Sequence, residues 1–240
     1  MPRPLLRSPL IAAIALVVVA LPSVAGLPTP DAASLQFDVG VPQGEFHHYV
    51  RSPGFGLSAQ AEYAPLGLPL RGGFLLGFLV YGSRTRNEIE TENTLADLDL
   101  ILKLAPQVWR FRPYASGFGG VRLLYTKSEP VETDEDLDGS AEALPRVDQA
   151  DVTLTYGGAA GLQFLLWEGV ATFTTDDRSE RKPLSFFLDL GARYLRGGRA
   201  DYLRKGDLHG SPEEPTYSVH RSRTDLLTFQ LGIVIDGLGN

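Results

Sequence analysis

An acidic run in the middle of the chain carries the residue types of a calcium site. Three alternating aspartates are followed by Gly139, which matches the first half of the D-x-D-x-D-G calcium loop. Carboxylates at alternate positions can converge on one hard cation, and glycine permits the sharp turn. Pro145 stands at the twelfth position, where the full pattern requires a bidentate glutamate. The candidate ligands of a weak calcium site are Asp134, Asp136, Asp138 and Glu142; the alternative is a solvated acidic loop.

Histidines in two other segments could bind a transition metal or serve a hydrolase if their loops meet. Lipid-modifying enzymes use serine, histidine and an acid, and Ser52 could supply the hydroxyl. However, the chain has no G-x-S-x-G nucleophile motif. We therefore expect no catalytic residue and no cofactor other than weakly bound calcium, and we favour a non-enzymatic protein. The residues of the two segments that could form such a metal or hydrolase site are Glu45, His47, His48, Asp207 and His209.

A third set of charges lies within segments where apolar and polar residues alternate. Period two over many residues predicts β-strands. Several of these segments are longer than the five or six residues of a typical soluble strand, and a tilted membrane strand needs about 9 to 11. The expected strands are 35–41, 57–63, 71–81, 97–104, 112–125, 152–166, 186–194 and 227–235.

These eight strands predict an all-β, antiparallel, up-and-down transmembrane barrel with its apolar faces toward lipid. The opposite faces then point into a lumen just wide enough for side chains to fill it. Charges confined there must pair, because an isolated buried ion is costly. We therefore expect a plugged, salt-bridged lumen. Its charge network would comprise Asp38, Glu62, Arg71, Asp97, Asp99, Lys103, Arg112, Arg122, Asp189 and Arg193.

The connections are expected to alternate between long external loops and short turns, as in outer-membrane barrels. The long loops are 42–53, 83–93, 126–150 and 197–221, and the short turns are 65–69 and 105–110. The segment 167–183 is long where a short turn is expected. We interpret it as a polar periplasmic insertion, with an extra strand around 170–174 as the alternative.

The runs Phe37–Phe46 and Gly54–Tyr63 resemble the opening of the outer-membrane β-barrel family that includes OmpA-like and OmpX-like eight-stranded barrels. The resemblance covers residues 35–236 in layout. It implies a monomer in the bacterial outer membrane, in contact with membrane lipid and lipopolysaccharide and inserted by the barrel-assembly machinery. One departure is the C-terminus, because such barrels usually end on an aromatic residue and this chain continues past Ile235.

The N-terminus has the layout of a secretory signal: basic residues, a short apolar run, then small residues. We place the cleavage between Ala25 and Gly26. The expected organisation is a signal peptide (1–25), a lead-in (26–34), the barrel (35–236) and a tail (237–240). Loss of the two arginines in the signal would change the formal net charge from −7 to −9.

An acidic chain without surplus Lys and Arg is not a nucleic-acid binder, and without cysteine it forms no disulfide. Its expected role is structural or in surface interaction. The alternatives are a lipid-modifying enzyme or binding module at the loop mouth, and a soluble exported barrel that carries an apolar ligand. Interior charge argues against the last, because a ligand-carrying cavity should be apolar.

Overall fold

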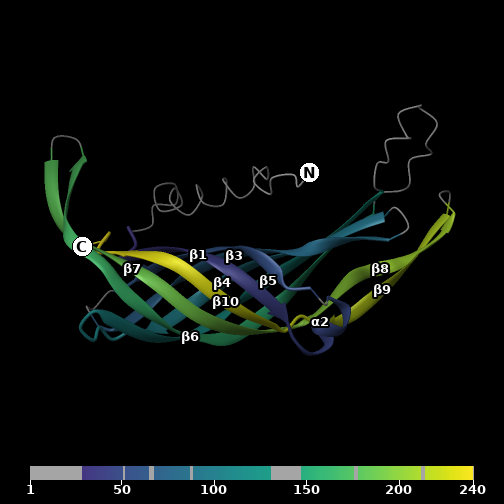
Figure 1. Cartoon of the computed structure of the whole chain (residues 1–240), viewed down its shortest axis with the longest axis horizontal. Coiled ribbons are helices and arrows are strands. Elements are labelled where there is room, and N and C mark those ends of the chain that lie inside the picture. Colours follow the sequence, from purple (N-terminus) through teal and green to yellow (C-terminus); the bar gives the residue numbers. More distant parts are fainter. Residues whose placement is uncertain are drawn as a thin grey trace.

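The computed structural model describes residues 29–50, 52–64, 68–86, 89–130, 147–175, 178–211 and 214–239. Eight strands form one closed antiparallel barrel, and two more form a separate hairpin (Figure 1). The barrel strands are β1 (Ala32–Pro42), β2 (Gly54–Tyr63), β3 (Leu70–Arg86), β4 (Ile89–Leu104), β5 (Phe111–Pro130), β6 (Val147–Thr175), β7 (Arg178–Gly197) and β10 (Leu226–Asp236). The hairpin consists of β8 (Arg199–Ser211) and β9 (Glu214–Arg223).

The barrel closes where its first and last strands pair. Ala32 lies opposite Asp236 on β10 and opposite Glu62 on β2. Closure leaves no free edge at membrane depth, so every backbone group in the ring finds a partner without water. The prediction of an eight-stranded up-and-down antiparallel barrel is confirmed.

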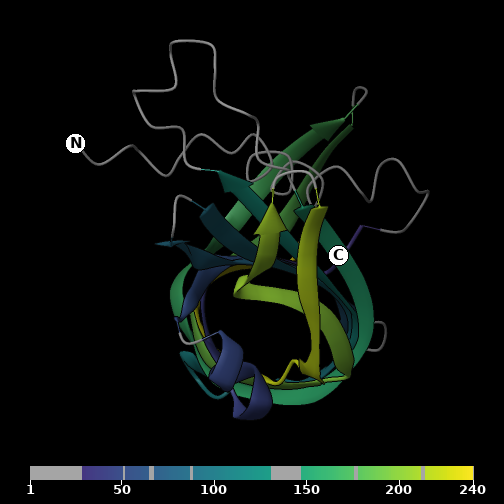
Figure 2. The same cartoon turned by 90° about the vertical axis from the view of Figure 1, so that its right-hand side faces the viewer.

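We call the end of the barrel that carries Ala32 and Asp236 the terminal end, and the opposite end the loop end. At the loop end lie the β8–β9 hairpin and the short helix α2 (Gly44–Tyr49) (Figure 1). The view along the barrel shows the strands as a closed ring, with α2 at its rim (Figure 2). No helix in the described residues is long and apolar enough to cross a membrane.

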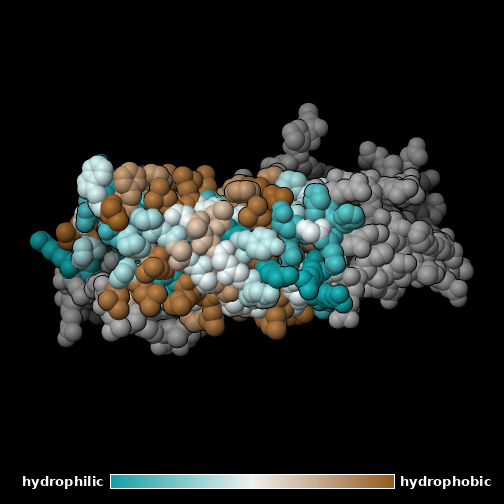
Figure 3. All heavy atoms as spheres, turned by 90° about the horizontal axis from the view of Figure 1, so that it is seen from below, coloured by the Kyte–Doolittle hydropathy of each residue, from teal (hydrophilic) through white to brown (hydrophobic). Residues whose placement is uncertain are grey.

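Large apolar side chains face outward around the barrel, as the alternation predicts. Along β4, for example, Leu98, Leu100 and Leu102 are exposed. Side chains between them, such as Asp99 and Ile101, are buried. The surface view shows apolar residues over the body of the barrel and hydrophilic residues gathered toward its two ends (Figure 3).

The connections differ from the sequence prediction in five places. Strands β3 and β4 extend through most of the expected loop 83–93, and β5 and β6 extend into the two ends of the expected loop 126–150. The expected loop 197–221 mostly forms the β8–β9 hairpin, and the expected loop 42–53 contains α2. The segment 167–183, expected to be a polar insertion, consists mostly of paired strands, because β6 and β7 continue into it as an extension. Residues 170–174 belong to β6 and do not form an extra strand. A register shift between Leu165 and Trp167 marks where this extension leaves the barrel (Figure 1).

Candidate functional site: the charged lumen

The loop end of the lumen is closed by apolar side chains. Phe46 of α2 is fully buried there and packs edge-on against Tyr81, with 5.8 Å between the ring centroids. The N-terminal end of the helix is held by two hydrogen bonds to the end of β9 and the residues that follow it. The Gln43 amide donates to the Asp225 carbonyl at 2.9 Å, and the Glu45 carboxylate accepts from the Arg223 amide at 3.2 Å. The cluster consists of Phe46, Val50, Leu79, Tyr81, Leu95, Leu124, Ala200 and Leu226.

Below this cluster lies a fully buried ion pair between neighbouring strands. Arg122 donates from Nε to one oxygen of Asp97 at 2.6 Å and from Nη2 to the other at 2.9 Å. Its third nitrogen donates to the Thr224 carbonyl. The guanidinium therefore joins β4 and β5 to the segment that enters β10, and its charge is compensated without water.

The middle of the lumen contains a network of amide side chains. The Gln36 carbonyl oxygen accepts from Ser58, Gln60 and Gln230, and its amide donates to Asp189 at 3.1 Å. Arg193 donates to Asp38 at 3.4 Å on the far side of this group. Strands that are distant in sequence are thus connected across the barrel, in addition to their backbone ladders.

A second ionic cluster fills the terminal end. Lys103 forms an ion pair with Glu62 and lies over the Tyr114 ring, 4.8 Å from its centroid. Asp236 accepts from Arg71 at 2.9 Å and pairs with Arg112 at 2.6 Å. The last barrel strand is therefore held to β3 and β5 by one carboxylate.

The structure brings the ten charges of the predicted network into the lumen. Nine of them are buried and Arg71 is mostly buried. The predicted charge network did not include Asp236. It also left out the four glutamines at positions 36, 60, 163 and 230, which the alternation turns inward but which carry no charge. A signal for Asp236 was present, because it continues the inward phase of Thr228, Gln230 and Gly232 along β10.

Two carboxylates have no ion-pair partner among the described residues. Asp99 accepts from the Thr155 hydroxyl at 2.8 Å, and Asp189 accepts from the amides of Gln36 and Gln163. The other lumen carboxylates each contact an Arg or Lys. Neutral donors therefore bind one oxygen of each of these two acids, while the other oxygen has no hydrogen-bond partner among the described residues.

The other predicted sites are placed differently. The acidic run with Asp134, Asp136, Asp138 and Glu142, and the cleavage position at Ala25 and Gly26, lie outside the described residues. His47 and His48 are exposed on α2. The side chains of Asp207 and His209 also lie outside the described set. Within the part of the chain that is described, no group of three or more His, Asp or Glu could hold a metal ion.

A polar interior and an apolar exterior reverse the distribution of a soluble protein. If this barrel were surrounded by water, the apolar side chains that point outward from β4 and β10, such as Leu100 and Leu231, would be exposed to it. Exposed apolar side chains on so many strands of a closed barrel indicate a surface that is covered by another apolar phase, and a polar lumen inside the ring favours lipid as that phase. Together with closure and an even number of antiparallel strands, this distribution is the arrangement of bacterial outer-membrane barrels. The chain therefore has the architecture of a transmembrane β-barrel.

The sequence matches no protein-family model, and no curated protein matches it significantly. Among solved structures, the chain is similar to Neisserial surface protein A, at 12% identity and a TM-score of 0.43, covering 86% of this chain and 96% of that one. It is also similar to Ail, the attachment invasion locus protein of Yersinia pestis, at 12% identity and a TM-score of 0.42, covering 85% and 95%. The chain is similar as well to the N-terminal β-barrel domain of Pseudomonas aeruginosa OprF, at 13% identity and a TM-score of 0.38, covering 86% of this chain and 97% of that one. These similarities concern the fold alone.

Proposed function

We propose that this barrel does not conduct and that it anchors paired β-structure outside the membrane for surface interaction. The observation that carries the first part is the burial of the lumen side chains. Arg122 and Arg193 are inaccessible to water, as are Tyr81 and Phe46 nearer the loop end. A water-filled pore would have to pass these levels and would expose their side chains.

The second part rests on strand length. A tilted strand needs about 9 to 11 residues to cross the hydrocarbon. The β4–β5 ladder runs without interruption from the Leu104–Ala115 pair to the Ile89–Pro130 pair. It therefore continues past the membrane at the loop end, where the β8–β9 hairpin adds further paired backbone. Rigid paired strands present a surface at lower entropic cost than irregular loops.

Planar-bilayer recording tests the first part. Folded protein, verified by its heat-dependent migration on a denaturing gel, should add no steady conductance to the bilayer. A reproducible unit conductance from the same preparation would contradict a closed lumen.

Epitope tags in intact cells test the second part. A tag between Ser211 and Glu214, in the β8–β9 hairpin, should be labelled by antibody without permeabilisation. A tag between Thr175 and Arg178, in the β6–β7 extension, is the matched control and should be labelled only after permeabilisation. The reverse pattern would place the β8–β9 hairpin in the periplasm and remove the surface role.

A further inference from the structure

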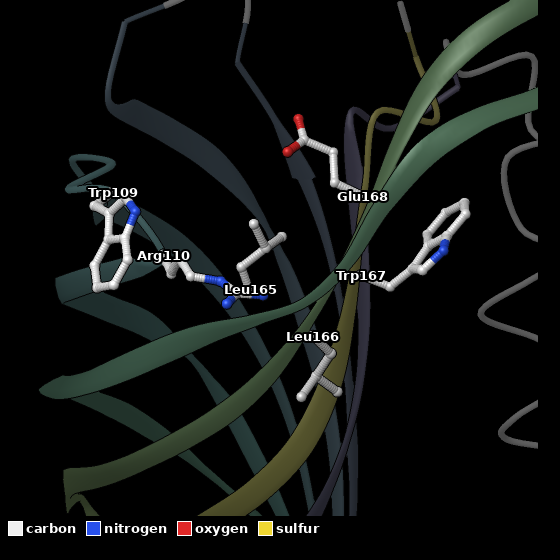
Figure 4. Close-up of a pocket in the computed structure, with 6 residues that line it drawn as sticks. All are labelled: Trp109, Arg110, Leu165, Leu166, Trp167 and Glu168. Atoms are coloured by element: carbon white, nitrogen blue, oxygen red, sulfur yellow. The ribbon is translucent and has the colours of Figure 1, made fainter.

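A pocket of about 640 Å³ opens at the rim of the terminal end. One wall is the turn that joins β4 to β5, and the other is the part of β6 where its register shifts. In the close-up, Arg110 reaches from the turn toward β6, and Trp109 and Trp167 lie on opposite sides of the six residues that line the pocket (Figure 4). The pocket is lined by Trp109, Arg110, Leu165, Leu166, Trp167 and Glu168.

The turn holds Trp109 in an unfavourable backbone conformation. Val108 and Phe111 exchange two backbone hydrogen bonds, of 2.8 and 3.0 Å, so Trp109 and Arg110 are the central pair of a two-residue hairpin. Trp109 has a φ of 55°, and no other non-glycine residue in the described ranges has a positive φ. Two-residue hairpins normally place glycine, asparagine or aspartate at such a position. Strain of this kind is concentrated at functional sites.

The strained turn exposes the indole of Trp109 instead of burying it. Its side chain is 78% exposed, although tryptophan in a protein core is mostly buried. The turn follows the apolar outer face of β4, which ends at the exposed Leu104. Trp109 and Trp167 therefore lie near the edge of the lipid-facing surface, where tryptophan is favoured between hydrocarbon and water. Phe111 and Phe186 pack against these two indoles.

Two opposite charges in the pocket have no side-chain partner among the residues that the structure describes. Within the described ranges, neither the Arg110 guanidinium nor the Glu168 carboxylate forms an ion pair or a side-chain hydrogen bond, and both are exposed. The backbone brings the two residues to the same rim, because the Leu165 amide donates to the Arg110 carbonyl at 2.8 Å. The pocket thus presents one cation and one anion beside apolar and indole surface.

We propose that this pocket binds the headgroup of a zwitterionic phospholipid. The lipid phosphate would lie on Arg110 and the headgroup ammonium on Glu168, while the acyl chains descend along the apolar outer face near Leu166. Both charges are then matched, as in charge-assisted recognition generally. A phospholipid that carries only the negative charge would match Arg110 but face repulsion from Glu168. The inference does not depend on whether the lumen conducts.

Native mass spectrometry of the full barrel in detergent, with equimolar phosphatidylethanolamine and phosphatidylglycerol, tests the proposal. The wild type should retain phosphatidylethanolamine in preference to phosphatidylglycerol by about two- to fivefold, the ratio expected of one partly exposed charge pair. Glu168→Gln should abolish that preference, and Arg110→Gln should reduce retention of both lipids. Arg196→Gln, at an exposed arginine near the loop end, is the matched control and should leave both unchanged.

Trp109→Gly separates a ligand-binding role from a structural one. Glycine accepts the positive φ, so the barrel should fold at least as well as the wild type, which heat-dependent gel migration will report. Lipid retention should nevertheless fall, because the indole surface is lost. The proposal would be overturned if Arg110→Gln, Glu168→Gln and Trp109→Gly all retained the two lipids to the same extent as the wild type. A wild-type preference for phosphatidylglycerol would replace it with an anionic-lipid site.

Discussion

Replacing Arg122 by methionine should destabilise the barrel by about 3–5 kcal/mol, although methionine is apolar and of similar length. Arg122 is fully buried and makes two bonds to Asp97, of 2.6 and 2.9 Å, and a third to the Thr224 carbonyl. Each hydrogen bond to a charged group contributes about 1.5–3 kcal/mol, and desolvation of the ions offsets part of this sum. The larger effect is that Asp97 would remain buried without a cation.

The double variant distinguishes this mechanism from simple loss of packing. Asp97→Leu alone should cost a similar amount, because Arg122 would then be the unpaired ion. Combining Arg122→Met with Asp97→Leu removes both charges, and the total cost should fall to about 1 kcal/mol or less, because an apolar pair of similar volume is often neutral. The two changes are therefore expected to be strongly non-additive.

Urea unfolding of the barrel in lipid vesicles measures these costs through tryptophan fluorescence. Both tryptophans of the chain, Trp109 and Trp167, lie at the terminal end, away from Arg122. Arg196→Met, at an exposed position, should change stability by no more than about 0.5 kcal/mol. Costs that simply add in the double variant, or a cost below about 1 kcal/mol for Arg122→Met, would refute the reasoning.

Three further outcomes are expected. Leu100→Arg should destabilise the vesicle-inserted barrel by about 2–4 kcal/mol in the same unfolding assay, and Leu68→Arg, near the terminal rim, by about 0–1 kcal/mol. Equal costs for the two variants would mean that Leu100 does not lie deep in lipid. Asp236→Asn should cost about 1.5–3 kcal/mol by urea unfolding, because Arg112 loses its charged partner and Arg71 keeps only the longer contact with Glu62, at 3.9 Å. An unchanged midpoint would contradict this role. If the acidic run binds calcium, titration to roughly 10 mM should protect residues 126–150 from protease, and replacement of the three aspartates by asparagine should abolish that protection.

The faces of the strands could be predicted from sequence because lipid and the packed lumen impose opposite requirements on alternate residues. On β4 this requirement alone separates Leu98, Leu100 and Leu102 from Asp97 and Asp99. No such requirement acts on β8 and β9, which pair with each other outside the barrel. Their sequences therefore carry no period that distinguishes a hairpin from a loop.

The partners of the lumen charges could not be predicted. Pairing of Arg122 with Asp97 follows from their direct register on adjacent strands. Contact of Asp236 with Arg71 and Arg112 requires side chains to meet across the closed ring, which depends on strand tilt and stagger. The same holds for the pocket at the terminal end. It forms because β6 shifts its register beyond Leu165, where the alternation gives no warning.

Site-directed spin labelling along β4 tests the central claim, a lipid-embedded barrel with a closed lumen. The chain has no cysteine, so single cysteines can be introduced without background. Labels at Leu98, Leu100 and Leu102 should be reached by oxygen dissolved in the lipid, since Leu100 is 62% exposed toward that side. A label at Ile101, 5% exposed, should be reached neither by oxygen nor by a water-soluble nickel reagent. Access of the nickel reagent to Ile101 would reveal a water-filled pore, and a flat oxygen profile along β4 would contradict the membrane-spanning barrel itself.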